Sequence, residues 1–202
     1  MSKDWKGNDK SVWKILGASS HTEEEREIND YYATEPLAME LLLKEEEFDN
    51  NIWECAVGGG HLAEVLKNTG HNVKCSDIID RGYPNTEIID FLKIIPDSQN
   101  LWDGDIITNP PYSFAQGFVE KAMDLIQDGH KVAMFLKLTF LEGKSRKGMF
   151  AKYPPKVIYV SSSRLKCCKN GDFKNNFSSA VAYGWFVWEK GFQGDPIIKW
   201  IN

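Results

Sequence analysis

Short apolar runs typical of buried β-strands alternate with amphipathic helical patterns along most of this 202-residue chain. Such alternation predicts a doubly wound α/β fold, in which helices cover both faces of a mostly parallel sheet. The predicted strands span residues 51–55, 73–77, 86–89, 104–108, 131–137 and 156–160, and the predicted helices span 36–48, 61–67, 113–128 and 145–151. Two further strand patterns, 179–189 and 196–200, have no helix between them. We therefore expect an antiparallel hairpin at the edge of the sheet.

A glycine turn follows the first predicted strand. Gly58, Gly59 and Gly60 connect that strand to the helix at 61–67, and glycine is favoured where the backbone turns tightly and a ligand comes close. The next predicted strand ends in Asp77. In a doubly wound sheet, an acid at this place accepts hydrogen bonds from ribose hydroxyls. The glycine pattern also fits a nicotinamide-binding dehydrogenase, and Asp77 also fits a solvated acid at a strand end.

The sequence Asn-Pro-Pro-Tyr at 109–112 directly follows the predicted strand 104–108. The Asn109 side-chain carbonyl and the Pro110 backbone carbonyl could each accept one N–H of an exocyclic amine, which would localise the nitrogen lone pair and aim it at an electrophile. Pro110 and Pro111 stiffen the loop because proline fixes φ. Tyr112 offers a flat face for a base lifted out of its stack. The pattern predicts chemistry on a planar NH₂ group, and a proline-rich turn closed by a surface tyrosine is the alternative.

A third acid, Asp90, follows the predicted strand 86–89 and precedes Phe91. Asp90 could accept a hydrogen bond from the amino group of an adenine, with the Phe91 ring beside the base. A plain strand terminus would have the same sequence, so both interpretations stay open.

Taken together, these motifs resemble those of class I S-adenosylmethionine-dependent methyltransferases of the DNA adenine-N6 type, in their compact phage or prophage form. The segment 109–112 resembles the catalytic motif of that family, residues 30–36 resemble its N-terminal cofactor motif, and the order of motifs is similar to its gamma arrangement. The resemblance implies catalytic roles for Asn109, Pro110, Pro111 and Tyr112. It implies cofactor contacts for Tyr31, Tyr32, Thr34, Pro36, Glu54, Gly58, Gly60, Asp77, Ile78, Asp90, Phe91 and Asn109.

By this resemblance, residues 30–202 form a Rossmann-like methyltransferase domain with a seven-stranded sheet, preceded by an arm at residues 1–29. The implied cofactor is S-adenosylmethionine, no metal is required, and the methyl acceptor is the exocyclic N6 amine of adenine in DNA. Little of the chain is left for a separate target-recognition domain, so we expect low or short sequence specificity. RNA base amines and protein glutamine N5 amides suit the same loop chemistry and stay open as substrates.

The net charge of −5 is unevenly distributed along the chain. Residues 131–174 carry eleven Lys or Arg and two acidic residues, a net charge of +9, whereas the remainder carries −14. A basic face on an acidic body predicts a nucleic-acid partner, DNA rather than RNA by the resemblance, with cations on phosphates and rings on exposed bases. Besides Tyr112, the expected substrate-binding residues are Lys144, Arg146, Lys147, Arg164, Lys166, Lys169, Phe173, Lys174 and Phe177. A pair of merely solvated loops is the alternative.

Composition predicts a cytoplasmic globular protein. Hydrophobic residues make up 42% of the chain and charged residues 26%, which is ordinary for a folded domain. Its apolar runs are far shorter than the roughly 20 residues that span a bilayer, and no signal-peptide core follows the first residues. The four cysteines lack the paired spacing of a zinc site. We expect reduced cysteines and no membrane partner, and the sequence predicts no particular oligomeric state.

Overall fold

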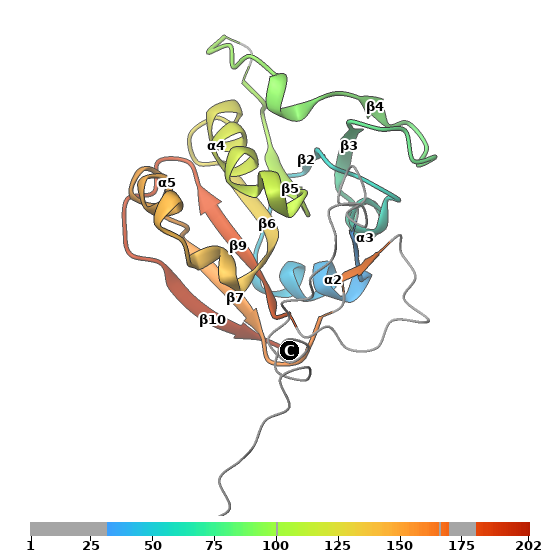
Figure 1. Cartoon of the computed structure of the whole chain (residues 1–202). Helices are drawn as coiled ribbons and strands as arrows, with labels where there is room; N and C mark the ends of the chain where they lie inside the picture. The colour runs from blue at the N-terminus through green and yellow to red at the C-terminus, as the bar shows by residue number, and fades with distance from the viewer. Residues whose placement is uncertain (1–31, 100, 166, 170–180) are drawn as a thin grey trace, which may run out of the picture.

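The computed structural model describes residues 32–99, 101–165, 167–169 and 181–202, and its centre is a mixed eight-stranded sheet (Figure 1). The strand order across the sheet is β10-β7-β9-β6-β5-β2-β3-β4. These strands are β2 (Asn51–Glu54), β3 (Asn72–Asp77), β4 (Glu87–Ile88), β5 (Asp105–Thr108), β6 (Lys131–Lys137), β7 (Val157–Ser161), β9 (Tyr183–Glu189) and β10 (Ile197–Ile201). A separate two-stranded sheet pairs β1 (Tyr32–Thr34) with β8 (Cys167–Lys169). The arm predicted at residues 1–29 lies outside the described residues.

Helices cover both faces of the large sheet (Figure 1). They are α2 (Pro36–Glu45), α3 (His61–Asn68), α4 (Ala115–Leu125) and α5 (Lys147–Lys152). Helices α4 and α5 pack on one face, and α2 and α3 pack on the other. Strand β6 serves both layers, because Val132 and Met134 join the α4 side while Ala133 and Phe135 join the α2 side. Burial on both faces explains why this strand is an uninterrupted apolar run. In the described part of the chain, no helix is long and apolar enough to cross a membrane.

The predicted alternation of strands and helices is confirmed, with local differences. The predicted helix at 113–128 divides into a 3₁₀ turn, η3 (Tyr112–Phe114), and helix α4. Phe114 lies in that turn and is exposed. Strand β4 has only two residues, both exposed, since it pairs with β3 alone at the sheet edge. Helix α2 ends at Glu45, where the next residue turns to an extended conformation.

Strand β9 lies between β6 and β7 and runs antiparallel to both. An antiparallel pair near the C-terminus is therefore present, but the predicted pairing of 179–189 with 196–200 is wrong, since β7 separates these two strands. Strand β10, at the predicted position, instead pairs parallel with β7, and the sheet has eight strands where the resemblance implied seven. Burial explains this order. The side chains from Trp185 to Trp188 are all buried, as suits an interior strand that is paired along both of its edges. Strand β10 is exposed along most of its length, as suits the edge of the sheet.

The winding of the chain reverses between β2 and β5. Strand β2 pairs parallel with β3 on one side and with β5 on the other, and the chain continues outward from each of these neighbours. In open α/β sheets, ligands bind outside the carboxyl ends of the strands at such a reversal. Glu54 ends β2, and Thr108 ends β5 directly before Asn109. The fold therefore brings the predicted cofactor and amine-binding segments to one edge of the sheet.

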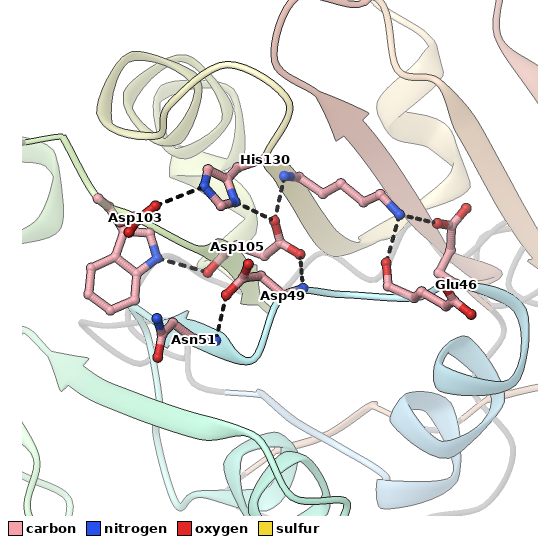
Figure 2. Close-up of polar contacts among 9 residues, drawn as sticks. Glu46, Asp49, Asn51, Asp103, Asp105 and His130 are labelled. Carbon is pink, nitrogen blue, oxygen red and sulfur yellow. Dashed lines mark hydrogen bonds and ion pairs between the residues drawn. The ribbon is translucent and has the colours of Figure 1, made fainter.

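At the opposite edge of the sheet, the buried Asp105 carboxylate joins the starts of three strands (Figure 2). It accepts hydrogen bonds from Asp49 N at 2.7 Å and from Lys131 N at 2.6 Å. His130 lies between two acids, with Nδ1 3.4 Å from Asp105 Oδ1 and Nε2 3.3 Å from Asp103 Oδ1. Burial raises the pKa of Asp105, and the two N–H donors oppose that shift. The carboxylate thus holds the segment before β2 against β5 and β6.

Replacing Asp105 with alanine removes the charged acceptor of two backbone N–H groups. Hydrogen bonds to charged groups each contribute about 1.5–3 kcal/mol, so we expect the free energy of unfolding to fall by about 3 kcal/mol. Asp103→Ala is the control, because the Asp103 side chain is 78% exposed and surface changes usually stay within about 0.5 kcal/mol. Urea unfolding followed by tryptophan fluorescence measures both variants. Equal losses would contradict an anchoring role for Asp105.

Candidate active site

A pocket opens at the carboxyl edge of β2 and β5. Its lining residues are Tyr32, Ala33, Thr34, Glu54, Ala56, Val57, His61, Leu62, Asp77, Arg81 and Asn109. The residues of this lining that the sequence predicted as cofactor contacts are Tyr32, Thr34, Glu54, Asp77 and Asn109. They come from β1, β2, β3 and the loop after β5, so the fold brings together segments that are far apart along the chain.

Other members of the predicted cofactor set lie around this pocket or outside the described residues. Pro36 is the first residue of α2, directly after the loop that follows β1. Ile78 follows Asp77 and is 51% exposed, which leaves an apolar surface next to that acid. Tyr31 lies outside the described residues.

The turn after β2 requires glycine at two positions. Gly58 and Gly60 have φ angles of 55° and 82°, which lie in the left-handed region that side chains disfavour. The Gly58 N–H donates to Asp77 Oδ2 at 2.8 Å and ties the turn to the end of β3. A Cβ added at Gly60 would lie 2.1 Å from the Tyr83 ring. The Tyr83 hydroxyl in turn donates to Glu64 at 2.6 Å, so the ring is held against the glycine turn.

Two buried carboxyl groups line the pocket, and Glu54 and Asp77 are only 1% and 7% exposed. Asp77 accepts from the backbone N–H of Gly58 and, at 3.1 Å, from that of Ile79. Glu54 accepts from Ala56 N at 3.2 Å. Burial raises the pKa of Glu54 to about 8, and the Asp77 charge adds to this shift while the Ala56 N–H opposes it. Glu54 is therefore mostly the neutral acid at pH 7, and a cation bound beside it would favour its ionised form.

The nitrogen of the Asn109 side-chain amide is held by a hydrogen bond. Its Nδ2 donates to Tyr32 O at 2.7 Å, and because a carbonyl oxygen only accepts, this bond defines which end of the amide carries the nitrogen. The Oδ1 atom of Asn109 is buried and has no hydrogen-bond partner among the described residues, and the same holds for Thr34 Oγ1 and Thr108 Oγ1. Buried polar atoms are nearly always paired. Three unpaired oxygens in these adjoining segments therefore mark a place where a ligand would complete the bonding.

The two prolines of the loop lead into the turn η3. Pro110 is buried, and the Pro111 carbonyl accepts the Phe114 N–H at 2.9 Å. Because neither proline has an N–H to donate, the loop presents acceptors rather than donors beside Asn109.

The Tyr112 ring is half-buried and surrounded by other groups. Its hydroxyl lies 3.0 Å from Cys167 Sγ, and the Tyr183 ring centroid is 5.7 Å from its own. The Lys137 ammonium lies 4.6 Å from the centroid of the Tyr112 ring, within the range of a cation–π contact. A base that stacks on Tyr112 would therefore have to displace the lysine.

Phe91 does not face the pocket. Its buried ring packs against Trp53 at 5.4 Å and against Phe118 at 5.1 Å between centroids. These aromatic side chains bury one another in the core, and a contact of Phe91 with a cofactor ring stays a prediction. Asp90 accepts the Leu92 N–H at 3.2 Å and caps the turn that follows. Asp90 thus has a structural role as the cap of this turn, and its contact with an adenine stays a prediction.

The predicted basic residues follow β6 and β7, whose carboxyl ends lie at the same edge as that of β5. Lys144 and Lys147 are exposed there. Arg146 instead folds back on its own loop, where Nε donates to Phe140 O at 2.8 Å and Nη2 donates to Glu142 O. Its guanidinium holds the loop closed, which argues against the predicted phosphate contact.

The second predicted basic segment is described only in part. Arg164 is exposed, and Lys169 contributes its backbone to β8. The other residues expected to bind substrate lie outside the described residues, and they are Lys166, Phe173, Lys174 and Phe177.

Sequence reasoning missed several residues around the site. Arg81 and His61 line the pocket, and burial lowers the pKa of His61. Arg81 follows the carboxyl end of β3, and His61 directly follows the glycine turn. These positions are a signal that could have found both residues. Cys167 and Tyr183, which contact Tyr112, give no such signal, because they reach it only through the pairing of strands distant in sequence.

No protein-family model and no curated protein sequence matches this chain. Solved structures do match it. A predicted O-methyltransferase from Agrobacterium tumefaciens has a TM-score of 0.59 at 10% identity, with 83% of this chain and 86% of that one covered. A proposed class I S-adenosylmethionine-dependent methyltransferase from Listeria monocytogenes has a TM-score of 0.56 at 14% identity, with 81% and 62% covered. The modification subunit of a proposed type I restriction enzyme from Vibrio vulnificus has a TM-score of 0.55 at 11% identity, with 95% and 50% covered.

At these identities the likeness concerns the fold. The chain spans 62% of the Listeria protein and half of the Vibrio subunit. The chain has the α/β fold of class I S-adenosylmethionine-dependent methyltransferases.

Proposed function

We propose that this protein binds S-adenosylmethionine in the pocket at the carboxyl edge of β2 and β5 and transfers its methyl group to the N6 amine of adenine in DNA. The observation that carries the proposal is the buried, unpaired Oδ1 of Asn109. Because the Asn109 nitrogen is already bonded to Tyr32 O, the free oxygen is available as an acceptor for an N–H of the target.

The polar groups of the pocket suit this cofactor. S-adenosylmethionine supplies, when bound, a methyl group activated on a positively charged sulfonium, and it also carries ribose hydroxyls. In this proposal, Asp77 accepts hydrogen bonds from the ribose hydroxyls, and the Glu54 carboxylate pairs with the positive charge of the sulfonium. The unpaired Thr34 Oγ1, which lines the same pocket, provides a further polar contact.

The loop at 109–112 prepares the target amine. Asn109 Oδ1 accepts one N–H and the Pro110 carbonyl accepts the other, which localises the nitrogen lone pair away from the ring system. The flipped base stacks on Tyr112. Lys137, whose ammonium lies over that ring in the free protein, moves aside and meets a backbone phosphate.

The charge distribution supports a nucleic acid over a protein substrate. Residues 131–174 carry a net charge of +9, and Lys144 and Lys147 are exposed at the edge where the pocket opens. The likeness to a modification subunit of a restriction enzyme is in keeping with DNA. We expect low or short sequence specificity, because the affinity in this proposal comes mainly from phosphate contacts, which carry no sequence information.

S-adenosylmethionine should raise the melting temperature, whereas NAD should not, because a ligand that binds only the native state stabilises it. Asp77→Asn keeps the size of the side chain but removes its charge, so we expect cofactor affinity to fall at least about tenfold. Asp80→Asn is the matched control, an exposed acid three positions away. Titration calorimetry gives both dissociation constants. Unchanged affinity in Asp77→Asn would exclude Asp77 from the site.

Asn109→Ala should reduce kcat by at least about a hundredfold, as loss of a polarising group typically does, while cofactor affinity stays within about twofold. Transfer of labelled methyl groups to unmethylated DNA, followed by nucleoside analysis, should yield N6-methyladenine. RNA of the same sequence and a glutamine-containing peptide are the comparison substrates. Preferred methylation of either one would reject DNA adenine as the target but keep the amine chemistry of the loop.

Binding to DNA should depend strongly on salt, because the protein supplies its affinity mainly through phosphate contacts. Replacing Lys144 and Lys147 together with alanine should lower affinity for all DNA sequences alike and reduce the slope of log K against log salt by up to about two. Lys44→Ala is the control, an exposed lysine in the last turn of α2, near the edge where β2 begins. An equal change of slope in both variants would contradict a basic rim beside the pocket.

A further inference from the structure

Cys167 is the first residue of β8, and its thiol is buried against the catalytic loop. The Sγ atom lies 3.0 Å from the Tyr112 hydroxyl, 3.5 Å from Asn109 Nδ2 and 3.6 Å from Tyr32 O. One side chain therefore touches both Asn109 and Tyr112, and it reaches them from a strand more than fifty residues further along the chain.

The contacts of Cys167 account for both hydrogens of the Asn109 amide. One N–H donates to Tyr32 O at 2.7 Å and the other is directed at Cys167 Sγ. The thiol donates its own proton to Tyr32 O, and the Tyr112 hydroxyl is then left to donate to the sulfur. In this arrangement both N–H groups of the Asn109 amide are used, and its oxygen is left without a partner among the described residues.

The thiol is suited to hydrogen bonding rather than to nucleophilic chemistry. Burial raises the pKa of Cys167 to about 11, so the side chain is protonated at neutral pH. Its described neighbours are a phenol, an amide and a carbonyl, and none of these is a base that would take the proton.

We propose that Cys167 is a positioning residue, which holds the Asn109 amide with its oxygen toward the target amine and fixes the Tyr112 ring beside it. This inference rests on the proposed function. Cys167 also lies next to the pocket, because its register partner in the β1–β8 pair is Thr34, which lines that pocket.

The test compares Cys167→Ala, Cys167→Ser and Cys168→Ala. Cys168 is buried, is next to Cys167 on β8, and points to the opposite side of the strand because side chains alternate. Loss of the thiol lets the amide turn, and a misplaced group in an active site costs up to about a hundredfold in rate. We expect Cys167→Ala to lower kcat ten- to hundredfold, with KM for DNA and the dissociation constant of S-adenosylmethionine within about twofold.

Cys167→Ser should restore kcat to within about threefold of the unmodified protein, since a hydroxyl also donates and accepts. Cys168→Ala should lower the melting temperature about as much as Cys167→Ala but leave kcat unchanged. A full kcat in Cys167→Ala, or an equal loss in Cys168→Ala, would overturn the positioning role.

Nuclear magnetic resonance of the Asn109 side-chain amide tests the contact without any turnover. Cys167→Val, which fills the space of the thiol without a hydrogen-bonding atom, serves where Cys167→Ala does not fold. In the free protein and in Cys167→Ser, both amide protons should exchange slowly with water, and in Cys167→Ala or Cys167→Val one of them should exchange at least about tenfold faster. Equal exchange in all variants would overturn the inference. A protein that keeps this protection pattern but methylates no DNA would reject the proposed function and retain the contact.

Discussion

The parallel pairing of β2 with β5 is the constraint on which the site depends. Ile52 pairs with Asp105 and Trp53 with Ile106, and this register places the ends of both strands at one edge. The Asp105 carboxylate fixes the register from the far edge, because it accepts N–H groups from the segment before β2 and from the start of β6. A slip of one residue would break these bonds and move the side chains of the slipped strand to the opposite faces of the sheet. Glu54 and Asn109 therefore meet through bonds made at the opposite end of the sheet.

Local features of the fold could be predicted from the sequence, and contacts between distant segments could not. The order of strands and helices, the glycine turn and the place of Asn109 all follow from periodicity and turn chemistry within short windows. The position of β9 depends on which strand is apolar enough to lie inside the sheet, and this can be decided only by comparing all of the strands. Arg146 shows the same limit. Its sequence position in the basic rim predicts a phosphate contact, but in the structure its guanidinium donates to three carbonyls of its own loop.

The pocket and its rim carry different charged groups. Two buried acids, Glu54 and Asp77, line the pocket together with Arg81, while exposed lysines lie along the rim. Glu54 has its pKa raised to about 8 by burial, so its contribution to stability is complete below its ordinary pKa and is lost as the pH rises through about 8. At neutral pH the free protein therefore keeps a neutral acid where a cationic ligand would stabilise a carboxylate. Burial of the Glu54 carboxylate is unfavourable, and a positively charged ligand would reduce this cost. The exposed lysines of the rim attract a polyanion to the mouth of the pocket.

The alignment of Asn109 and access to the pocket depend on the same small sheet. Tyr32, which accepts from the Asn109 nitrogen, belongs to β1, and β1 also lines the pocket. In the described part of the chain, three residue pairs join β1 to β8, whereas seven join β6 to β9 in the eight-stranded sheet. Each unpaired buried oxygen behind it costs about 1–3 kcal/mol. In the proposed function, a cofactor bonded to Thr34 and a target amine bonded to Asn109 would each offset part of that cost. Strand β1 therefore serves both, since Thr34 lines the pocket and the Tyr32 carbonyl orients the amide.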